Sequence, residues 1–161
     1  MVNEEMNSGY IVIIFSAILL ITGAILIYCD IEDKKLIAQQ YEKERYNNFL
    51  EQFHELSPEE FFELRRKKEG DIVGVYILYN ETKKLSYVGQ ATRLFFRINQ
   101  HLTGSGNGDV YADYKYGDKF WIRIIPLTKS KYNDLDKLER DTIKMFDSYN
   151  HGYNKTHGNN V

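Results

Sequence analysis

The C-terminal part of the chain holds two tyrosines, an arginine and a histidine at short spacings, and a glutamate further on. Tyr76 and Tyr87 are eleven residues apart, and Arg97 follows ten residues after Tyr87. His101 comes four residues after Arg97, which puts both on one face of a helix. Hydrolysis of a phosphodiester needs a nucleophilic water, a proton acceptor, cationic support for the transition state and usually a metal ion. Together with the carboxylate of Glu139, these residue types can supply each requirement.

The two tyrosines belong to a mirrored pair of short motifs. Residues 74–76 read Gly-Val-Tyr and residues 87–89 read Tyr-Val-Gly. The polar residues that follow at matching spacings are Arg97, His101, Glu139 and Asn154. Over about residues 72–157 this pattern resembles the GIY-YIG endonucleases, with valine in place of isoleucine at positions 75 and 88.

The resemblance implies a role for each residue around the tyrosines. Tyr76 would activate the water, and Tyr87 beside it would position the site through its hydroxyl. A tyrosine has an ordinary pKa near 10, so Tyr76 would need a nearby positive charge to act as a base. Arg97 fits that requirement and can also bind phosphate oxygens through two hydrogen bonds. His101 would share in proton transfer or accept the proton itself, because the ordinary pKa of histidine lies near neutral pH.

The same resemblance implies a metal ligand and contacts to nucleic acid. Glu139 would bind one Mg²⁺ or Mn²⁺, since such hard cations take few protein carboxylates and keep several waters. Asn154 would hold the end of the site by hydrogen bonds. Arg93, Arg97 and Lys155 would contact the phosphate backbone, with a solvent-facing role as the alternative for Arg93. Glu139 is expected on a different side of its helix from most of the inward apolar residues.

The C-terminal pattern of residues predicts an α/β (α+β) domain. The expected fold of this domain is a small three-stranded sheet flanked by helices. One transmembrane helix and a helical spacer are expected before it. The expected strands cover residues 72–79, 84–88 and 120–127, the expected helices cover 92–102 and 135–147, and a glycine-rich loop covers 104–108. Because residues 72–88 read as a hairpin, we expect Tyr76 and Tyr87 to lie side by side.

Residues 10–28 form a nineteen-residue run without a charge, with a tyrosine at each end. A helix of that length spans about 28 Å, which matches a bilayer core. A cleaved signal peptide would begin with a positive charge and end in small residues, and neither is present. A buried core helix is the remaining alternative. Cys29, the only cysteine, excludes an intrachain disulfide; we expect a free thiol there, or a site of reversible acylation.

Charges on either side of this run predict its orientation. The leader, residues 1–9, holds two glutamates and no lysine or arginine, whereas Lys34, Lys35, Lys43 and Arg45 follow the run. The positive-inside rule therefore places the N-terminus outside and the C-terminal domain in the cytoplasm of a single-pass membrane protein.

Residues 29–70 read as a charged helical spacer with two helices. The first would run over about residues 32–56, with Phe49, Leu50, Phe53 and Leu56 on one side. The second would start at Pro58, with Ser57 as N-cap and Glu60 closing a capping box. We expect the spacer to pack on the C-terminal domain or on a second copy of the chain, or to bind a partner.

Net charge separates the two halves of the chain. Residues 1–70 hold 8 basic and 13 acidic side chains, net −5, whereas residues 71–161 hold 13 basic and 10 acidic, net +3. Only residues 71–161, the expected nuclease domain, suit a polyanion. The expected function is a membrane-anchored, metal-dependent DNA endonuclease acting on incoming foreign DNA at the inner membrane face. The alternatives are an RNA nuclease and a non-catalytic membrane adaptor, against which the intact motif residues argue.

Overall fold

The computed structural model of the chain describes residues 2–67 and 70–158, with side chains from Gly9 onward. The leader's acidic side chains and residues 68–69, at the end of the expected spacer, therefore lie outside the described part. The chain divides into two compact units, Met1–Asn47 and Asn48–Val161. Each unit is described by itself below.

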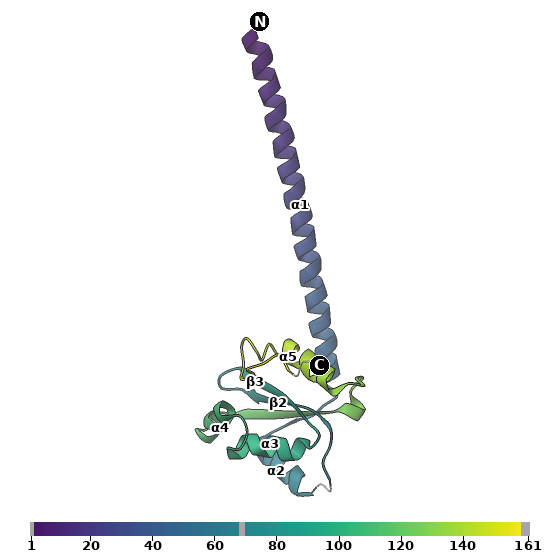
Figure 1. The fold of residues 1–161 in the computed structure, drawn as a ribbon, viewed down its shortest axis with the longest axis vertical. Coiled ribbons are helices and arrows are strands. Elements are labelled where there is room, and N and C mark those ends of the chain that lie inside the picture. The colour runs from purple at the N-terminus through teal and green to yellow at the C-terminus, as the bar shows by residue number, and fades with distance from the viewer. Residues whose placement is uncertain (1, 68–69, 159–161) are drawn as a thin grey trace. The chain divides into compact units, whose positions relative to one another are not determined.

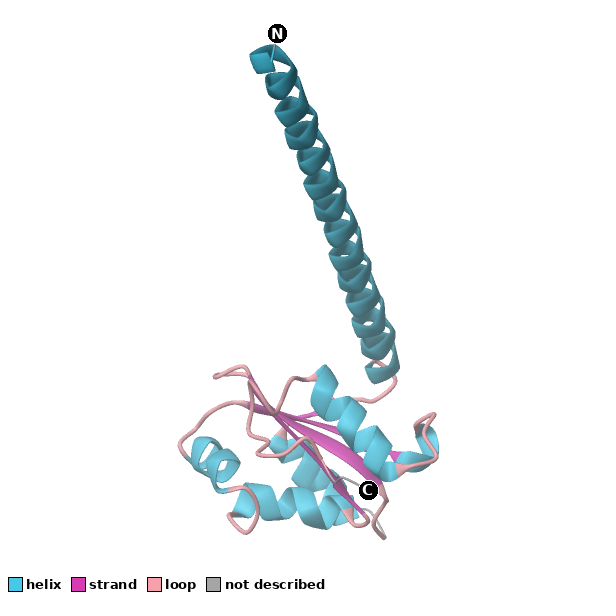
Figure 2. Ribbon diagram, turned by 45° about the horizontal axis from the view of Figure 1, so that its top comes forward, coloured by secondary structure: helices cyan, strands magenta, loops and turns pink. Residues whose placement is uncertain are grey.

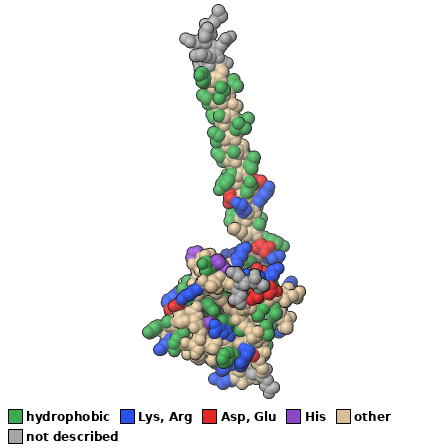
Figure 3. All heavy atoms as spheres, in the orientation of Figure 1, with side chains coloured by type: hydrophobic (Ala, Val, Ile, Leu, Met, Phe, Trp, Pro, Cys, Tyr) green, Lys and Arg blue, Asp and Glu red, His purple; other side chains and the backbone are tan. Residues whose placement is uncertain are grey.

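Helix α1 runs without a break over Val2–Leu50, a length of 49 residues. The expected transmembrane run and the first spacer helix are thus one element, because no proline and no helix-breaking glycine pair separates them. Hydrophobic side chains cover its surface from Tyr10 to Tyr28 (Figure 3). An 18-residue stretch within Gly9–Leu50 has a mean hydropathy of 2.8, and none of this stretch is buried. By length and composition this helix can cross a membrane. Cys29 on it is free and exposed.

The spacer prediction is wrong where α1 ends. The helix stops at Leu50, so Phe53 and Leu56 are not helical, and Glu55–Leu56 form the short strand β1 instead. Two causes favour this ending: the open edge of a neighbouring strand offers backbone partners, and Pro58 disfavours helix for the residue before it. Helix α2, Pro58–Lys67, begins as expected. Its capping box is confirmed, since the Ser57 N–H donates to Glu60 Oε2 at 2.8 Å and the Glu60 N–H donates to Ser57 Oγ at 3.2 Å.

Four antiparallel strands form the sheet in the order β1-β4-β2-β3 (Figure 2). The three expected strands are β2, Gly74–Asn80, β3, Leu85–Ala91, and β4, Phe120–Pro126, and β1 adds a short fourth strand at one edge. Strands β2 and β3 make the expected hairpin, in which Leu78 pairs with Tyr87 and Tyr76 pairs with Gly89. Strand β3 is therefore the other edge of the sheet.

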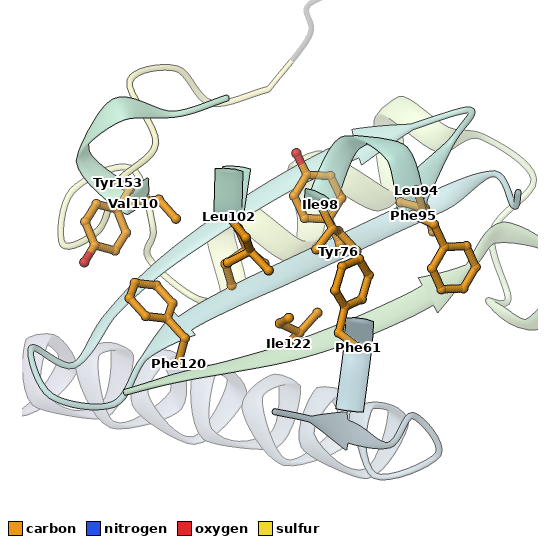
Figure 4. Close-up of a cluster of buried hydrophobic side chains, with 11 residues drawn as sticks. Phe61, Tyr76, Leu94, Phe95, Ile98, Leu102, Val110, Phe120, Ile122 and Tyr153 are labelled. Carbon is orange, nitrogen blue, oxygen red and sulfur yellow. The ribbon is translucent and has the colours of Figure 1, made fainter. Parts of the chain in front are cut away.

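Helices cover both faces of this sheet (Figure 1). Helices α2, α3, Leu94–Thr103, and α4, Gly108–Lys115, lie on one side, and α5, Leu135–Met145, lies on the other. A three-residue 3-10 helix, η1, Leu127–Lys129, follows β4. On the α3 side, alternate residues of β2 enter a cluster that contains Phe61, Tyr76, Leu78, Ile98 and Ile122 (Figure 4). This alternation places every second residue of β2 and β3 on the face that carries α5.

Helix α4 was not expected, because Gly104, Gly106 and Gly108 predicted only a loop. Asn107 starts this helix as its N-cap: its side-chain oxygen accepts the N–H groups of Asp109 and Val110. A single capping asparagine, followed by a buried valine, outweighs the low helix propensity of the flanking glycines.

Candidate active site

The hairpin brings the two motif tyrosines together on the α3 face of the sheet. Tyr76 sits on the central strand β2 opposite Gly89, and its ring crosses over that glycine. A Cβ at position 89 would lie 2.4 Å from the Tyr76 hydroxyl oxygen, so only glycine leaves room for it. Tyr87 comes two residues before Gly89 on the same face of β3. The glycine of the second motif thus serves the tyrosine of the first.

His101 completes a cluster of three rings with the tyrosines. The ring centroids of Tyr76 and Tyr87 are 6.1 Å apart, those of Tyr76 and His101 are 5.5 Å apart, and those of Tyr87 and His101 are 4.8 Å apart. A hydrogen bond of 2.8 Å joins the Tyr76 hydroxyl to His101 Nε2. Helix α3 presents His101 toward the sheet because Leu94, Ile98 and Leu102 bury the same face of the helix.

The hydrogen bonds of His101 define its protonation. Nδ1 lies 2.8 Å from the backbone N–H of Asn107. A backbone N–H can only donate, so Nδ1 carries a lone pair, and a neutral ring must hold its proton on Nε2. Nε2–H therefore donates to the Tyr76 hydroxyl oxygen. Burial and the nearby Arg97 charge lower the pKa of His101 to about 4, which keeps the ring neutral at neutral pH.

Two expected roles do not fit this arrangement. His101 does not titrate near neutral pH and has no free nitrogen to accept a proton from water, because burial and its two partners prevent it. Tyr76 is only 1% exposed. Burial raises its pKa well above the usual range and the Tyr87 oxygen raises it further, whereas the charge and hydrogen bond of Arg97 lower it by less. Tyr87 is only partly buried and is the more accessible of the two.

Glu139 is attached to the edge strand β3 from the side of α5. Its Oε1 accepts the backbone N–H of Gln90 and its Oε2 accepts the Gln90 side-chain N–H, both at 3.1 Å. The expectation that Glu139 points away from the buried side of its helix is wrong, since it is 8% exposed and is buried together with Leu138, Thr142 and Ile143. The Gln90 N–H on the edge strand needs an acceptor, and Glu139 supplies it.

Gln90 is a site residue that the sequence did not reveal. Its side-chain N–H groups donate to Glu139 Oε2 and, at 2.5 Å, to Asp136 Oδ1. It therefore holds two carboxylates of α5 in place. A glutamine after the Tyr-Val-Gly motif is not part of any recognisable sequence pattern. Its role is visible only from the contacts between β3 and α5.

The donor set around Glu139 fits a hard divalent cation. Among the residues that the structure describes, no three histidine, cysteine, aspartate or glutamate side chains form a metal-binding group. The fixed carboxylate of Glu139 suits a cation that takes oxygen ligands and keeps most of its waters.

Asn154 clamps the C-terminal tail onto β3. Its Oδ1 accepts the Val88 N–H and its Nδ2 donates to the Val88 carbonyl oxygen, both at 2.8 Å. The preceding residue continues this contact, because the Tyr153 N–H donates to the Ser86 carbonyl at 2.9 Å. These bonds satisfy the outer backbone groups of the edge strand beside Tyr87.

The three cations expected to bind nucleic acid differ in position. Arg97 is half-buried, acts on the Tyr76 hydroxyl and donates to Gln100 Oε1 at 2.9 Å. Arg93 is exposed, with its guanidinium 4.8 Å from the centre of the Phe96 ring. Lys155 is exposed and forms an ion pair of 3.0 Å with Asp109. The structure therefore brings Arg97 into the tyrosine cluster and leaves Arg93 and Lys155 on the surface.

Comparisons with known proteins identify a family of nucleases. The family model described as the GIY-YIG catalytic domain matches residues 72–154, just over half of the chain. Nucleases of that family generally depend on a divalent metal. A solved structure of a mutant of the catalytic domain of intron endonuclease I-TevI is similar, with 20% identity and a TM-score of 0.41. The match covers 55% of this chain and 98% of that chain. No curated protein sequence matches.

Proposed function

Since the chain belongs to the GIY-YIG family of phosphodiester-hydrolysing nucleases, we propose that it cuts DNA at the cytoplasmic face of a membrane, with Mg²⁺ or Mn²⁺ as cofactor. The observation that carries the proposal is the cluster of Tyr76, Tyr87, Arg97 and His101 beside the edge strand that also holds Glu139. The cluster supplies a proton acceptor and a cation, and Glu139, bound to the same edge strand from the α5 side, supplies an oxygen ligand for a metal.

The difference in burial between Tyr76 and Tyr87 supports different roles for the two tyrosines. Tyr87 is the more accessible tyrosine, and we assign to its phenolate oxygen the proton of the water that attacks phosphorus. As the new P–O bond forms, the bond to the leaving oxygen breaks, and that oxygen takes a proton from solvent. Tyr76 remains behind Tyr87, fixed by His101. The guanidinium of Arg97 stabilises the phosphate charge through paired hydrogen bonds.

Glu139 is assigned the metal for reasons of position and chemistry. Its carboxylate is fixed by Gln90 on the strand that carries Tyr87, and a bound divalent cation would neutralise charge that develops on the phosphate. Asn154 is assigned a supporting role, because its two bonds to Val88 fix the same strand.

DNA binding by this domain would rest on phosphate contacts. Arg93 and Lys155 on the surface would add to Arg97, and Lys155 would leave its partner Asp109 to do so. Such contacts carry no sequence information and weaken as salt rises. The residues that the structure describes hold no additional sequence-reading module, and the spacer is acidic. We therefore assign the enzyme a low sequence preference.

The apolar part of α1 supports the membrane anchor in the proposal. Its exposed hydrophobic surface would be covered by lipid, and the lysines and arginine that follow it favour the cytoplasmic side. A nuclease held there would meet DNA as it enters the cell. This supports a role in restricting incoming phage or plasmid DNA, or in processing DNA during uptake.

The substrate assignment is tested with the full-length chain in detergent. Supercoiled plasmid, linear duplex, single-stranded DNA and RNA are each incubated with Mg²⁺, with Mn²⁺ and with a chelator. We expect DNA cleavage with either metal, loss of cleavage with the chelator, and loss of cleavage in Tyr87→Phe. Tyr116→Phe is the matched control, because Tyr116 is 86% exposed and outside the cluster. Cleavage of RNA alone, or cleavage that survives the chelator, would refute the proposal.

A further inference from the structure

The loop between α3 and α4 approaches His101 closely. The backbone N–H of Asn107 donates to His101 Nδ1 at 2.8 Å, on the ring edge opposite Tyr76. Gly106 makes this approach possible, since a Cβ there would lie 2.6 Å from Nδ1 and 2.8 Å from the His101 Cα. A side chain at position 106 would push the loop away from the ring.

Asn107 is itself held by three bonds of its side chain. Its Oδ1 accepts the N–H groups of Asp109 at 2.9 Å and Val110 at 3.1 Å, which fixes it to the start of α4. Its Nδ2 donates to the Tyr153 carbonyl at 3.3 Å, which fixes it to the tail that bears Asn154. These bonds tie the Asn107 side chain to α4 and to the tail, two segments outside α3.

The hydrogen bond from His101 also determines where the hydroxyl proton of Tyr76 points. The Tyr76 oxygen accepts Nε2–H of His101 and interacts with the Arg97 guanidinium. Because this oxygen accepts from His101, the single Tyr76 proton points away from His101, and the ring of Tyr87 lies beside it with its centroid 6.1 Å away. A His101 ring with its proton on Nδ1 would reverse this order, because Nε2 would then accept the Tyr76 proton.

We propose that Asn107 is a positioning residue of the nuclease site: its backbone N–H keeps His101 Nδ1 unprotonated, so that Nε2–H donates to Tyr76 and the Tyr76 proton points away from His101. The catalytic meaning of this arrangement rests on the proposed function, whereas the histidine tautomer does not. Asn107 acts through two other residues and does not touch substrate.

The test removes the N–H by a substitution whose φ the backbone already has, and the proline Cδ, which takes the place of the amide hydrogen, separates the loop from the His101 ring. Asn107 has φ −74°, which proline also adopts, so Asn107→Pro deletes the donor without forcing a new angle. Asn107→Ala is the matched control, since it loses the same side-chain bonds and keeps the N–H. Gly106→Ala provides a second route, because it displaces the loop from the ring without removing the N–H.

The readout is the histidine tautomer in the full-length chain in detergent micelles. The chain holds four histidines, so nitrogen-15 labelling of histidine and one His101→Gln spectrum assign the signal. We expect the Nε2–H form in wild type and in Asn107→Ala, and its loss in Asn107→Pro and Gly106→Ala. Cleavage should fall by about 10²-fold or more in Asn107→Pro, by analogy with other wrong-tautomer histidines, and by much less in Asn107→Ala.

Each outcome decides for or against the proposal. An Nδ1–H tautomer in wild type overturns it without any variant, and so does an unchanged tautomer in both Asn107→Pro and Gly106→Ala. Equal losses of cleavage in the proline and alanine variants would show that Asn107 only caps α4. A wild-type chain that has the Nε2–H tautomer but cuts no nucleic acid would refute the proposed function and leave the tautomer assignment intact.

Discussion

Tyr76 and Tyr87 are equivalent in the motif but not in environment. Tyr76 lies in the hydrophobic cluster under α3, where burial raises its pKa, and Tyr87 lies on the edge strand with part of its surface open. A charged phenolate is costly without water. At the scale of single residues, exposure rather than motif order therefore supports Tyr87 as the proton acceptor and Tyr76 as its support.

Arg97 should be required for its shape as well as its charge. Arg97→Ala removes the cation to which we assign the reacting phosphate, so we expect kcat to fall by about 10²-fold or more. Arg97→Lys should recover little of this loss, because an ammonium cannot form the paired hydrogen bonds of a guanidinium. Steady-state cleavage of a labelled duplex measures both. Full activity in Arg97→Lys would show that charge alone suffices.

The low pKa of His101 should appear in the stability of the protein. Between pH 6.5 and about 4 the unfolded chain binds a proton at this residue and the folded chain does not, so the free energy of unfolding falls as pH falls. The loss is of the order of 3 kcal/mol at most. Urea unfolding across this range should show a steeper fall for wild type than for His101→Gln. Identical pH profiles in the two proteins would contradict the assignment.

Strand β3 is the element that gathers the site. It carries Tyr87, receives Glu139 through Gln90, and is bound along its outer edge by the tail through Asn154. Because β3 is an edge strand, its side chains contact helices on both faces of the sheet, and its outer backbone groups are open to the tail. Residues separated by more than fifty positions thus meet along one strand.

The clamp on β3 should contribute measurably to stability. Asn154→Ala loses two hydrogen bonds to Val88 and should lower the free energy of unfolding by about 1–3 kcal/mol. Asn154→Asp should destabilise at least as much, because one carboxylate oxygen would face the Val88 carbonyl. Asn150→Ala, at an exposed asparagine of the same segment, is the control. Thermal unfolding compares the three, and an Asn154→Ala protein as stable as this control would argue against the clamp.

Local signals in the sequence predicted most elements but not all. The hairpin, β4, α3, α5 and the start of α2 follow from β-branched runs, helical spacing and a capping box. Strand β1 could not be predicted from two residues, because only the edge of β4 makes it a strand. The same limit applies within the site: Gln90 and Asn107 act through backbone register and loop path, which short sequence patterns do not encode.

The whole molecule joins an acidic N-terminal region, which contains an exposed apolar helix, to a basic nuclease domain. Residues 1–70 carry net −5 and residues 71–161 carry net +3. Polyanion binding would be confined to the C-terminal domain, and the helix would confine that domain to a membrane surface. In the proposed function, such a tether would limit the enzyme to DNA that reaches the membrane.

Topology should follow the charges around residues 10–28. Protease added to intact spheroplasts should leave the C-terminal domain whole and should digest it only after lysis, because the lysines and arginine after the run favour the cytoplasm. Fractionation should recover the full-length chain with the membranes. Digestion from outside, or a shortened chain in the soluble fraction, would favour a secreted nuclease.

Glu139 offers the most direct measurement of the central claim, metal-dependent hydrolysis at the edge of β3. Cleavage of supercoiled plasmid by the full-length chain is measured with increasing Mg²⁺ for wild type, Glu139→Ala and Asp136→Ala. Asp136 is the matched control, since it lies one turn away and bonds the same Gln90 side chain. We predict that Glu139→Ala binds duplex DNA but loses cleavage at every Mg²⁺ concentration, while Asp136→Ala still cuts. Cleavage by Glu139→Ala near the wild-type rate at saturating Mg²⁺ would contradict this account.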